Sequence, residues 1–296
     1  NNSLTKQAYY DENLYNCYPW ARTVKVMNPL SSDLGVMRQT LLFGGLESIV
    51  RNVNRKARNL RFFEVGNVYH FDEERYTTES PIKAYQQHYH LALWVTGHRV
   101  EGNWAHPDEE SSFFELKAHV ENVLRRVGLQ AGQVVTEASD NNIFDKGLRM
   151  KTRGGKVLVD MGIVNHHVLR RFDIEQPVYY AEIDWTELMK ATRKNSLLFQ
   201  ELSKYPAVSR DLALLVDANV EFAQIEQIAR QTEKKLLKQV VLFDVYQGKN
   251  LPEGKKSYAV NFILQDESRT LTDKAIEAIM QKLMKNLTTK LHAELR

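Results

Sequence analysis

Hydrophobic and polar positions divide the first two hundred residues into short strands and helices. Aromatic and β-branched residues fill 61–71 and 89–95, which predicts two strands. Apolar residues at helical spacing predict a helix through 46–53, and a second helix begins behind a capping box formed by Ser112 and Glu115. Further strands are predicted at residues 133–138, 147–152, 156–164 and 178–184. The pattern indicates an α+β domain with a mostly antiparallel sheet.

The last third of the chain has a simpler order of elements. A polar, helix-tolerant stretch ends at Tyr205-Pro206, so we divide the chain into domains 1–202 and 203–296. The elements predicted after this boundary are a strand at 210–216, a helix at 221–236, strands at 240–246 and 256–265, a helix at 272–291 and a short final segment. This order is that of a ferredoxin-like βαββαβ unit.

Composition narrows the possible functions. The chain has no apolar run long enough for a transmembrane helix and its polar start is not a signal peptide, while the missing Met leads us to expect a piece of a longer protein. A single free thiol fits a reducing cytoplasm. The single cysteine, Cys17, excludes an internal disulfide and a cysteine-rich metal site. None of the nine histidines has a partner at a metal-ligand spacing, so we predict no metal site.

Charge adds little by itself. Lys and Arg balance Asp and Glu in residues 1–202, at 25 each, whereas residues 203–296 hold 15 basic against 12 acidic residues. The whole net charge of +3 therefore lies in the last third. This excess is too small to indicate nucleic-acid binding without other evidence.

Ferredoxin-like domains include iron–sulfur proteins, metallochaperones, amino-acid sensors and RNA binders, so the fold alone does not decide the function. Residues 203–296 contain no cysteine, which excludes the first two classes. The turn after the first strand, 217–220, has no glycine where sensors usually have one. An RNA-binding sheet face remains, and an ordinary solvated sheet face is its alternative.

Alternation assigns residues of this sheet to two faces. We expect the helix-facing set to contain Val241, Phe243, Val245, Tyr258, Val260, Phe262 and Leu264. We expect the open face to carry Leu242, Asp244, Tyr246, Ser257, Ala259 and Asn261. An acid, a hydroxyl, an amide and an aromatic ring suit unstacked bases, while Lys255, Lys256 and Arg210 near the strand ends would contact phosphates.

Several longer stretches resemble the β subunit of bacterial-type phenylalanyl-tRNA synthetase. In the first domain the matching stretches are Asn28-Pro29-Leu30-Ser31, Met37-Arg38, Asn52-Val53-Asn54-Arg55, Phe63-Glu64-Val65-Gly66-Asn67-Val68-Tyr69 and Phe113-Phe114-Glu115-Leu116-Lys117. In the second they are Tyr205-Pro206-Ala207-Val208-Ser209-Arg210-Asp211-Leu212-Ala213, Leu242-Phe243-Asp244-Val245-Tyr246-Gln247-Gly248 and Arg269-Thr270-Leu271-Thr272.

The resemblance implies a division of labour. Residues 1–202 correspond to a class II synthetase-like module without catalytic residues, which packs against the α subunit of an α2β2 enzyme. The α subunit uses ATP and Mg²⁺, so no cofactor is expected in this chain. Residues 203–296 correspond to a ferredoxin-fold domain that binds the anticodon stem-loop of phenylalanine tRNA, with base contacts at Asp244 and Ser257.

The chemistry expected of an active class II site is missing. His70 follows Val68-Tyr69 where an active chain has a phosphate-holding arginine, and no Gly-rich segment ending in Arg follows 178–184. We interpret Arg38 as a structural salt-bridge residue, and we expect the chain alone to be inactive. Two alternatives remain: a free-standing regulatory protein whose ferredoxin-like domain senses a small molecule, and an assembly module without RNA affinity.

Overall fold

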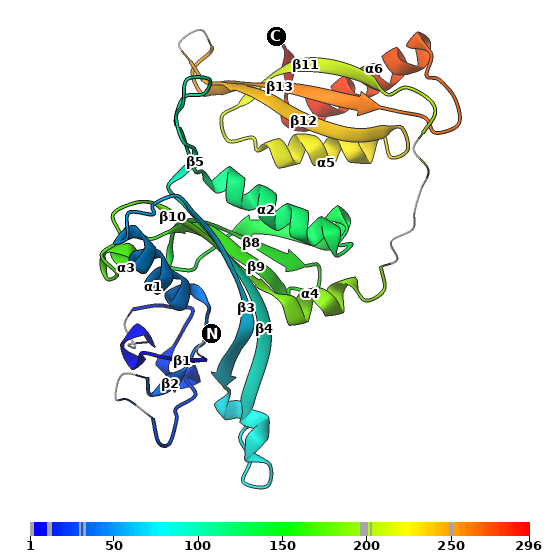
Figure 1. The fold of residues 1–296 in the computed structure, drawn as a ribbon. Helices are drawn as coiled ribbons and strands as arrows, with labels where there is room; N and C mark the ends of the chain where they lie inside the picture. The colour runs from blue at the N-terminus through cyan, green and yellow to red at the C-terminus, as the bar shows by residue number, and fades with distance from the viewer. Residues whose placement is uncertain are drawn as a thin grey trace. The chain divides into compact units, whose positions relative to one another are not determined.

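The computed structural model describes residues 3–10, 14–29, 31, 34–195, 201, 203–248 and 251–296. The chain divides into two compact units, Asn1–Leu197 and Leu198–Arg296 (Figure 1). The two units have separate hydrophobic cores. The predicted boundary after residue 202 lies close to this division. Among the described residues, no helix is long and apolar enough to span a membrane.

The larger unit contains a six-stranded antiparallel sheet in the order β3-β4-β10-β9-β8-β7 (Figure 1). The strands are β3 Leu60–Phe71, β4 Tyr85–Thr96, β7 Val134–Ala138, β8 Phe144–Thr152, β9 Val157–Val164 and β10 Val178–Asp184. The prediction of a mostly antiparallel sheet is therefore confirmed. Short pairs of strands flank it: β1 Leu4–Thr5 with β2 Val36–Met37, and β5 His98–Val100 with β6 Glu109–Glu110.

Both faces of this sheet are buried. Along β4, Ala92 and Trp94 join one core cluster, whereas Leu91 and Val95 join a second on the opposite face. The helices are α1 Leu42–Val53, α2 Phe113–Arg126, α3 His166–Arg170 and α4 Trp185–Thr192. Residues of α1 and the N-terminal segment fill the first cluster, and residues of α2 and α4 fill the second. Single-turn 3₁₀ segments occur at Gln7–Tyr10, Trp20–Arg22, Glu73–Arg75, Pro81–Ala84 and Ala131–Gln133.

Helix α2 begins as predicted, but only half of the capping box forms. The Ser112 hydroxyl accepts the backbone N–H of Glu115 at 3.3 Å, which satisfies one free amide of the first turn. The Glu115 carboxylate accepts Nε of Arg61 at 3.0 Å instead of reaching back to the cap. The helix start is therefore tied to strand β3 by an ion pair.

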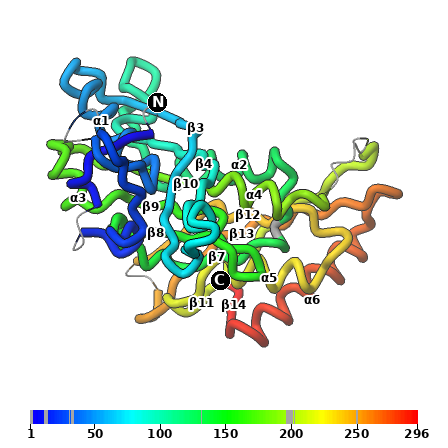
Figure 2. The backbone as a smooth tube through the Cα atoms, turned by 90° about the horizontal axis from the view of Figure 1, so that it is seen from below, coloured from blue at the N-terminus to red at the C-terminus, as the bar shows by residue number. Residues whose placement is uncertain are grey.

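The smaller unit has the ferredoxin-like order that the sequence predicts. Its elements are β11 Val208–Asp217, α5 Phe222–Thr232, β12 Leu237–Tyr246, β13 Lys255–Leu264, α6 Asp273–Leu291 and β14 Glu294–Leu295. The antiparallel sheet has the order β12-β13-β11-β14, and α5 contacts α6 (Figures 1 and 2). Residues from both helices and from alternate positions of β13 form one core, so the other sheet face stays open.

Two adjacent glycines of α1 differ in their surroundings. A Cβ added to Gly45 would lie 2.1 Å from Cε2 of Trp94, so α1 approaches the sheet closely only because this position has no side chain. Gly44 faces solvent, and a Cβ there would meet nothing within 4 Å.

We predict opposite effects of alanine at the two positions. Gly45→Ala forces Trp94 or α1 to shift and should lower the free energy of unfolding by about 1–3 kcal/mol, as overpacking does. Gly44→Ala, the matched control, should raise it by up to about 1 kcal/mol through helix propensity. Chemical denaturation of both variants measures the difference, and equal effects would contradict the close contact between α1 and Trp94.

Candidate functional site

The open face of the four-stranded sheet collects most of the predicted RNA-binding residues. Paired residues of neighbouring antiparallel strands point to the same face, and Val260 and Phe262 of β13 are fully buried on the helix side. Asn261, Ala259 and Ser257 therefore lie on the open side. Three cross-strand rows follow from the register: Val241-Asn261-Asp211, Asp244-Ala259-Ala213 and Tyr246-Ser257-Leu215.

The assignment of β12 needs a correction. Leu242 pairs with Val260 and packs on the core, whereas we predicted that it lies on the open face. The register then shifts, so that Asp244 pairs with Ala259 and Phe243 has no partner. Phe243 is 58% exposed and Val241 pairs with the outward Asn261, so the prediction that these two residues face the helices was wrong. Val245 pairs with Tyr258 on the helix side, and the four predicted residues of β13 are in the core, so the rest of the helix-facing set is confirmed. The cause of the error is a β-bulge, which adds one residue and changes the alternation.

Asp244 and Tyr246 do lie on the open face, beyond this bulge. The Asp244 side chain is exposed and forms no ion pair with another described residue, so its carboxylate can accept hydrogen bonds from a ligand. Asn261 is less available, because its Nδ2 donates to Oδ1 of Asp211 at 2.5 Å and also to Ser209. Its Oδ1 remains an acceptor. Ser257 lies on the open side but is only 5% exposed.

The three predicted phosphate contacts do not form one patch. Lys255 pairs with Asp217 across the sheet, and its Nζ contacts the carboxylates of Glu294 at 3.1 Å and Asp217 at 3.8 Å. Lys256 pairs with the buried Val216 and is 9% exposed.

Lys256 and Arg210 lie on the helix side of the sheet. Nζ of Lys256 lies 4.8 Å from the ring centroid of Tyr258, so Lys256 is not on the open face, and its contact with phosphates stays a prediction. Arg210 pairs with the buried Phe262 and lies 4.0 Å from Asp273 of α6.

One cation on the open face was missed by sequence reasoning. Arg296 follows β14, and its Cζ lies 5.2 Å from the ring centroid of Tyr246. Its backbone N–H donates to the carbonyl of Ala213 at 3.0 Å, which places it beside the row of Asp244 and Ala259. No motif distinguishes this arginine in the sequence, because its role depends on the pairing of β14 with β11.

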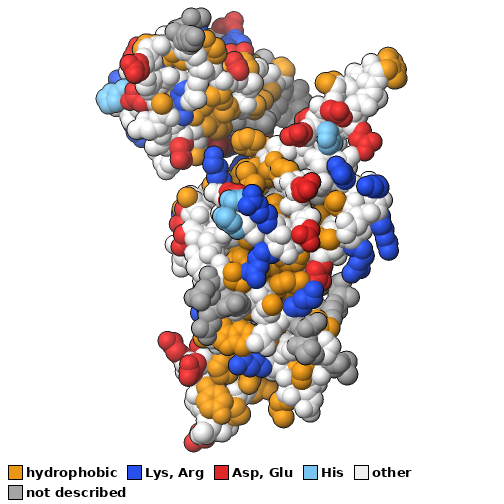
Figure 3. Space-filling view, turned by 90° about the vertical axis from the view of Figure 1, so that its left-hand side faces the viewer, with side chains coloured by type: hydrophobic (Ala, Val, Ile, Leu, Met, Phe, Trp, Pro, Cys, Tyr) orange, Lys and Arg blue, Asp and Glu red, His pale blue; other side chains and the backbone are white. Residues whose placement is uncertain are grey.

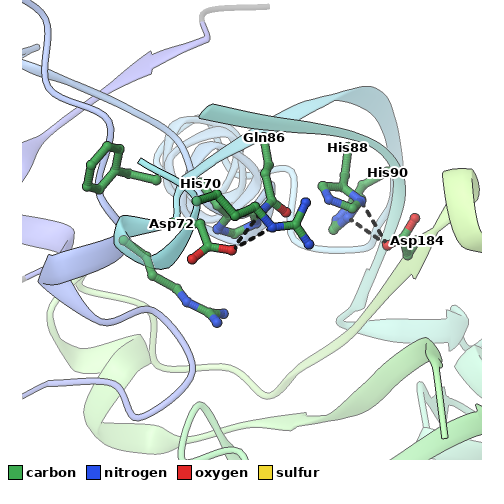
Figure 4. A pocket seen from close by; sticks show the side chains of 9 residues that line it. His70, Asp72, Gln86, His88, His90 and Asp184 are labelled. Carbon is green, nitrogen blue, oxygen red and sulfur yellow. Dashed lines mark hydrogen bonds and ion pairs between the residues drawn. The ribbon is translucent and has the colours of Figure 1, made fainter. Parts of the chain in front are cut away.

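The larger unit contains a polar pocket of about 340 Å³ at one end of its sheet (Figure 4). His70 of β3 and three alternate residues of β4 line it, and Asp184 of β10 closes one side. Asp72 accepts Nε2 of Gln86 at 2.9 Å and pairs with Arg75 at 3.1 Å. The full lining is Arg22, His70, Phe71, Asp72, Arg75, Gln86, His88, His90 and Asp184.

A buried carboxylate organises the floor of this region. Glu182 accepts the hydroxyls of Thr40 at 2.6 Å and Tyr180 at 2.7 Å, and the backbone N–H of Leu41 at 3.1 Å. Nδ1 of His90 lies 2.9 Å from Oε1 of Glu182. Burial alone would raise the pKa of Glu182, but these hydrogen bonds and the His90 charge lower it. Burial likewise opposes protonation of His90, whose pKa is nevertheless raised by Glu182 and Asp184.

The pKa of His70 shifts in the direction opposite to that of His90. Burial, reinforced by the nearby His90, His88 and Arg22, lowers its pKa to about 4, so it is neutral at pH 7. Its Nδ1 is buried without a partner among the described residues. A neutral imidazole cannot hold a phosphate as an arginine does.

Arg38 is committed elsewhere. Its Nη1 donates to Oε1 of Glu64 at 2.6 Å, and its Nε donates to the carbonyl of Asn67 at 2.9 Å. The close approach depends on Gly66, where a Cβ would lie 2.2 Å from Nη2 of Arg38. The structural salt bridge that we predicted for Arg38 is therefore present. In the described part of the chain, no group of three or more His, Cys, Asp or Glu side chains is arranged to hold a metal ion.

Comparison with known families gives a consistent result for both units. Residues 1–185 match the family model described as the phenylalanyl tRNA synthetase beta chain CLM domain. The chain belongs to this family. Residues 203–296 match the ferredoxin-fold anticodon binding domain, so both predicted family assignments are confirmed.

Relatives in the family cover the whole of the chain. The phenylalanine–tRNA ligase beta subunits of Bacteroides thetaiotaomicron and Porphyromonas gingivalis are 56% and 49% identical over all 296 residues. The chain spans only 36% of the length of each. Among solved structures, a pyrrolysyl tRNA synthetase of Desulfitobacterium hafniense matches 66% of this chain and 62% of its own, with a TM-score of 0.45 and 13% identity.

For this family member we predict a pH-dependent effect of His70→Gln. The unfolded chain binds a proton at His70 near pH 6.5 but the folded chain only near pH 4, so the wild type loses stability as the pH falls through this window. The loss is at most about 3 kcal/mol, since each pKa unit corresponds to about 1.4 kcal/mol. His70→Gln removes it, so the variant should gain stability relative to the wild type between pH 6.5 and 4.

His90→Gln is the matched control, with the opposite sign. The raised pKa of His90 contributes stability that is present below pH 6.5 and is lost as the pH rises through its folded pKa. Replacing His90 should therefore lower the stability of the folded chain most at the acid end of this pH range. Urea unfolding of all three chains across this range tests both signs, and parallel pH profiles would show that neither histidine titrates as described.

Proposed function

We propose that this chain is the tRNA-binding and α-subunit-binding part of a phenylalanine–tRNA ligase β subunit. Residues 203–296 bind the anticodon stem-loop of phenylalanine tRNA, and residues 1–202 pack against the α subunit of an α2β2 enzyme in the cytoplasm. The observation that carries the proposal is the open sheet face of an anticodon-binding fold, which presents Asp244, Tyr246 and Asn261 together.

The polar groups of this face suit a base rather than a phosphate. The free carboxylate of Asp244 repels phosphate but accepts N–H groups such as those on the Watson–Crick edge of guanine. The ring of Tyr246 offers a stacking plane, which is worth about 1–3 kcal/mol per base in single-stranded recognition. Ser257, in the next strand, adds a hydroxyl in register with Tyr246. Base identity would thus be recognised near Asp244, with Ser257 beside it.

The larger unit supports binding rather than catalysis. The pocket places neutral His70 where a phosphate-holding arginine is expected, and Arg38 is held by Glu64 and Asn67. The residues that line this pocket do not suit ATP and Mg²⁺, which the α subunit would bind. The chain alone would therefore form no aminoacyl-adenylate.

Exposed hydrophobic side chains on the larger unit favour a protein partner. Phe63 lies on β3, an edge strand of the six-stranded sheet, and is 73% exposed. Ile82 and Tyr85 are exposed at the turn between β3 and β4. The space-filling view shows hydrophobic side chains gathered in patches among Lys and Arg side chains (Figure 3). Such surfaces and uncovered sheet edges mark interaction sites.

We predict that Asp244→Ala reduces the preference for the cognate anticodon. The chain should bind a fluorescent phenylalanine anticodon stem-loop more tightly than a stem-loop with a swapped anticodon. Loss of the acceptor removes discrimination of about 1–3 kcal/mol, the value of a specific base contact, so the ratio of the two Kd values should fall about tenfold.

Glu277→Ala is the matched control, since Glu277 is an exposed acid on α6, on the helix side of the sheet. It should leave the ratio unchanged. Fluorescence anisotropy measures both Kd values, and an unchanged ratio for Asp244→Ala and Ser257→Ala in folded chains would show that the wrong surface has been chosen.

We predict that the chain binds purified α subunit and that Phe63→Asp weakens this binding at least tenfold, because a charge would be buried against the partner. Val135→Asp is the control, at an exposed position on β7 at the other edge of the same sheet. Analytical ultracentrifugation of the mixtures gives the affinities. A wild-type chain that stays monomeric and never associates with α subunit would refute the partner assignment.

A further inference from the structure

Tyr246 and Arg296 come from opposite edges of the small sheet yet meet above it. β12 and β14 are separated by β13 and β11, so roughly 14 Å of sheet lies between them at the usual strand spacing. The Cζ of Arg296 nevertheless lies 5.2 Å from the Tyr246 ring centroid, within the range of a cation–π contact. Both side chains must therefore extend across the two middle strands.

Three small residues, together with Leu215 in the row of Tyr246, lie on the open face between these side chains. Ala259 and Ala213 occupy the row beside Arg296, and Ser257 is the partner of Tyr246 in β13. Larger side chains at these positions would fill the space above the middle strands. At the other end, a Cβ on Gly248 would lie 2.5 Å from Oη of Tyr246, so this glycine makes room for the ring.

The backbone fixes the origin of Arg296, while its guanidinium lies over the Tyr246 ring. The N–H of Arg296 binds the Ala213 carbonyl at 3.0 Å, and the neighbouring Glu294 is tied to Lys255 of β13. Within the described residues, Arg296 forms no ion pair. Lys255 is neutralised by two carboxylates and Lys256 lies on the helix side, so neither offers a comparable free cation.

We infer that Arg296 is a further base-binding residue, which stacks on the base that Tyr246 receives and holds it from the second side. The inference rests on the proposed anticodon function. Guanidinium planes and aromatic rings both stack on unpaired bases. In the free protein the arginine covers the ring; in the complex the base lies between them, above Ala259 and beside Asp244.

The two neighbours of the base then have different tasks. Asp244 reads the edge of the base and decides which base binds. Arg296 contacts the face, which every base has, so it adds affinity without discrimination. Its planar, delocalised group is required, because the compact ammonium of lysine does not stack.

The test uses residues 1–296, with fluorescence anisotropy of the cognate stem-loop, the swapped stem-loop and a cognate probe lacking one anticodon base. Arg296→Ala should weaken cognate and swapped binding by the same factor, about fivefold, corresponding to an exposed cation–π contact. On the probe abasic at the position that contacts Tyr246, the substitution should have no effect. The position that contacts Tyr246 is identified separately: it is the anticodon position at which removal of the base abolishes the effect of Tyr246→Ala on the Kd.

Arg296→Lys separates stacking from phosphate contact. It should bind as weakly as Arg296→Ala, and rescue by lysine would show a phosphate contact and overturn the inference. An unchanged Kd for Arg296→Ala, or an equal loss on every abasic probe, would overturn it as well. Arg230→Ala, at an arginine paired with Glu226 on α5, is the control and should bind normally. If the unmodified chain binds no stem-loop, the proposed function itself fails, which is a distinct result.

Discussion

The alternation of side chains across antiparallel strands is the constraint on which both units depend. In the larger sheet, neighbouring residues in the second half of β4 enter different cores, so this part of the central strand packs on both faces. In the smaller sheet, both helices cover one face, and alternation leaves every second residue free on the other. The same rule thus produces a sheet covered on both faces in one unit and a sheet with one open face in the other.

In the larger unit, the charged groups near the pocket are paired with one another. Glu182 is stable as a buried anion only because two hydroxyls, a backbone N–H and His90 surround it. Removing one partner would leave a buried charge uncompensated. The network ties β4 and β10 to the start of α1, so the groups on this floor hold the fold and are not free to bind a ligand.

Much of the fold follows from local patterns, because helix caps, turns and apolar periodicity act over a few residues. The strand at 178–184 and the helix start at Ser112 are examples. The bulge after Leu242 is different: the stretch 240–246 alternates plausibly in two registers, and only pairing with β13 selects one. The side of the sheet on which Lys256 lies was not evident from the sequence, since a lysine can bury its stem on the helix side while its ammonium lies over Tyr258. Arg296 was missed because its neighbour is distant in sequence and depends on strand order.

On the proposed function, the charges of the open face require that its affinity for RNA come largely from stacking. Asp244 opposes an incoming phosphate backbone, and Lys255 is already neutralised by Glu294 and Asp217. Arg296, whose guanidinium lies over the ring of Tyr246 on the same face, would offset part of that repulsion. An acid that reads a base edge imposes an electrostatic cost on every RNA, cognate or not, so it improves selectivity more than affinity. On the proposed function, a neutral ring and a planar cation supply the attraction that such a site otherwise lacks.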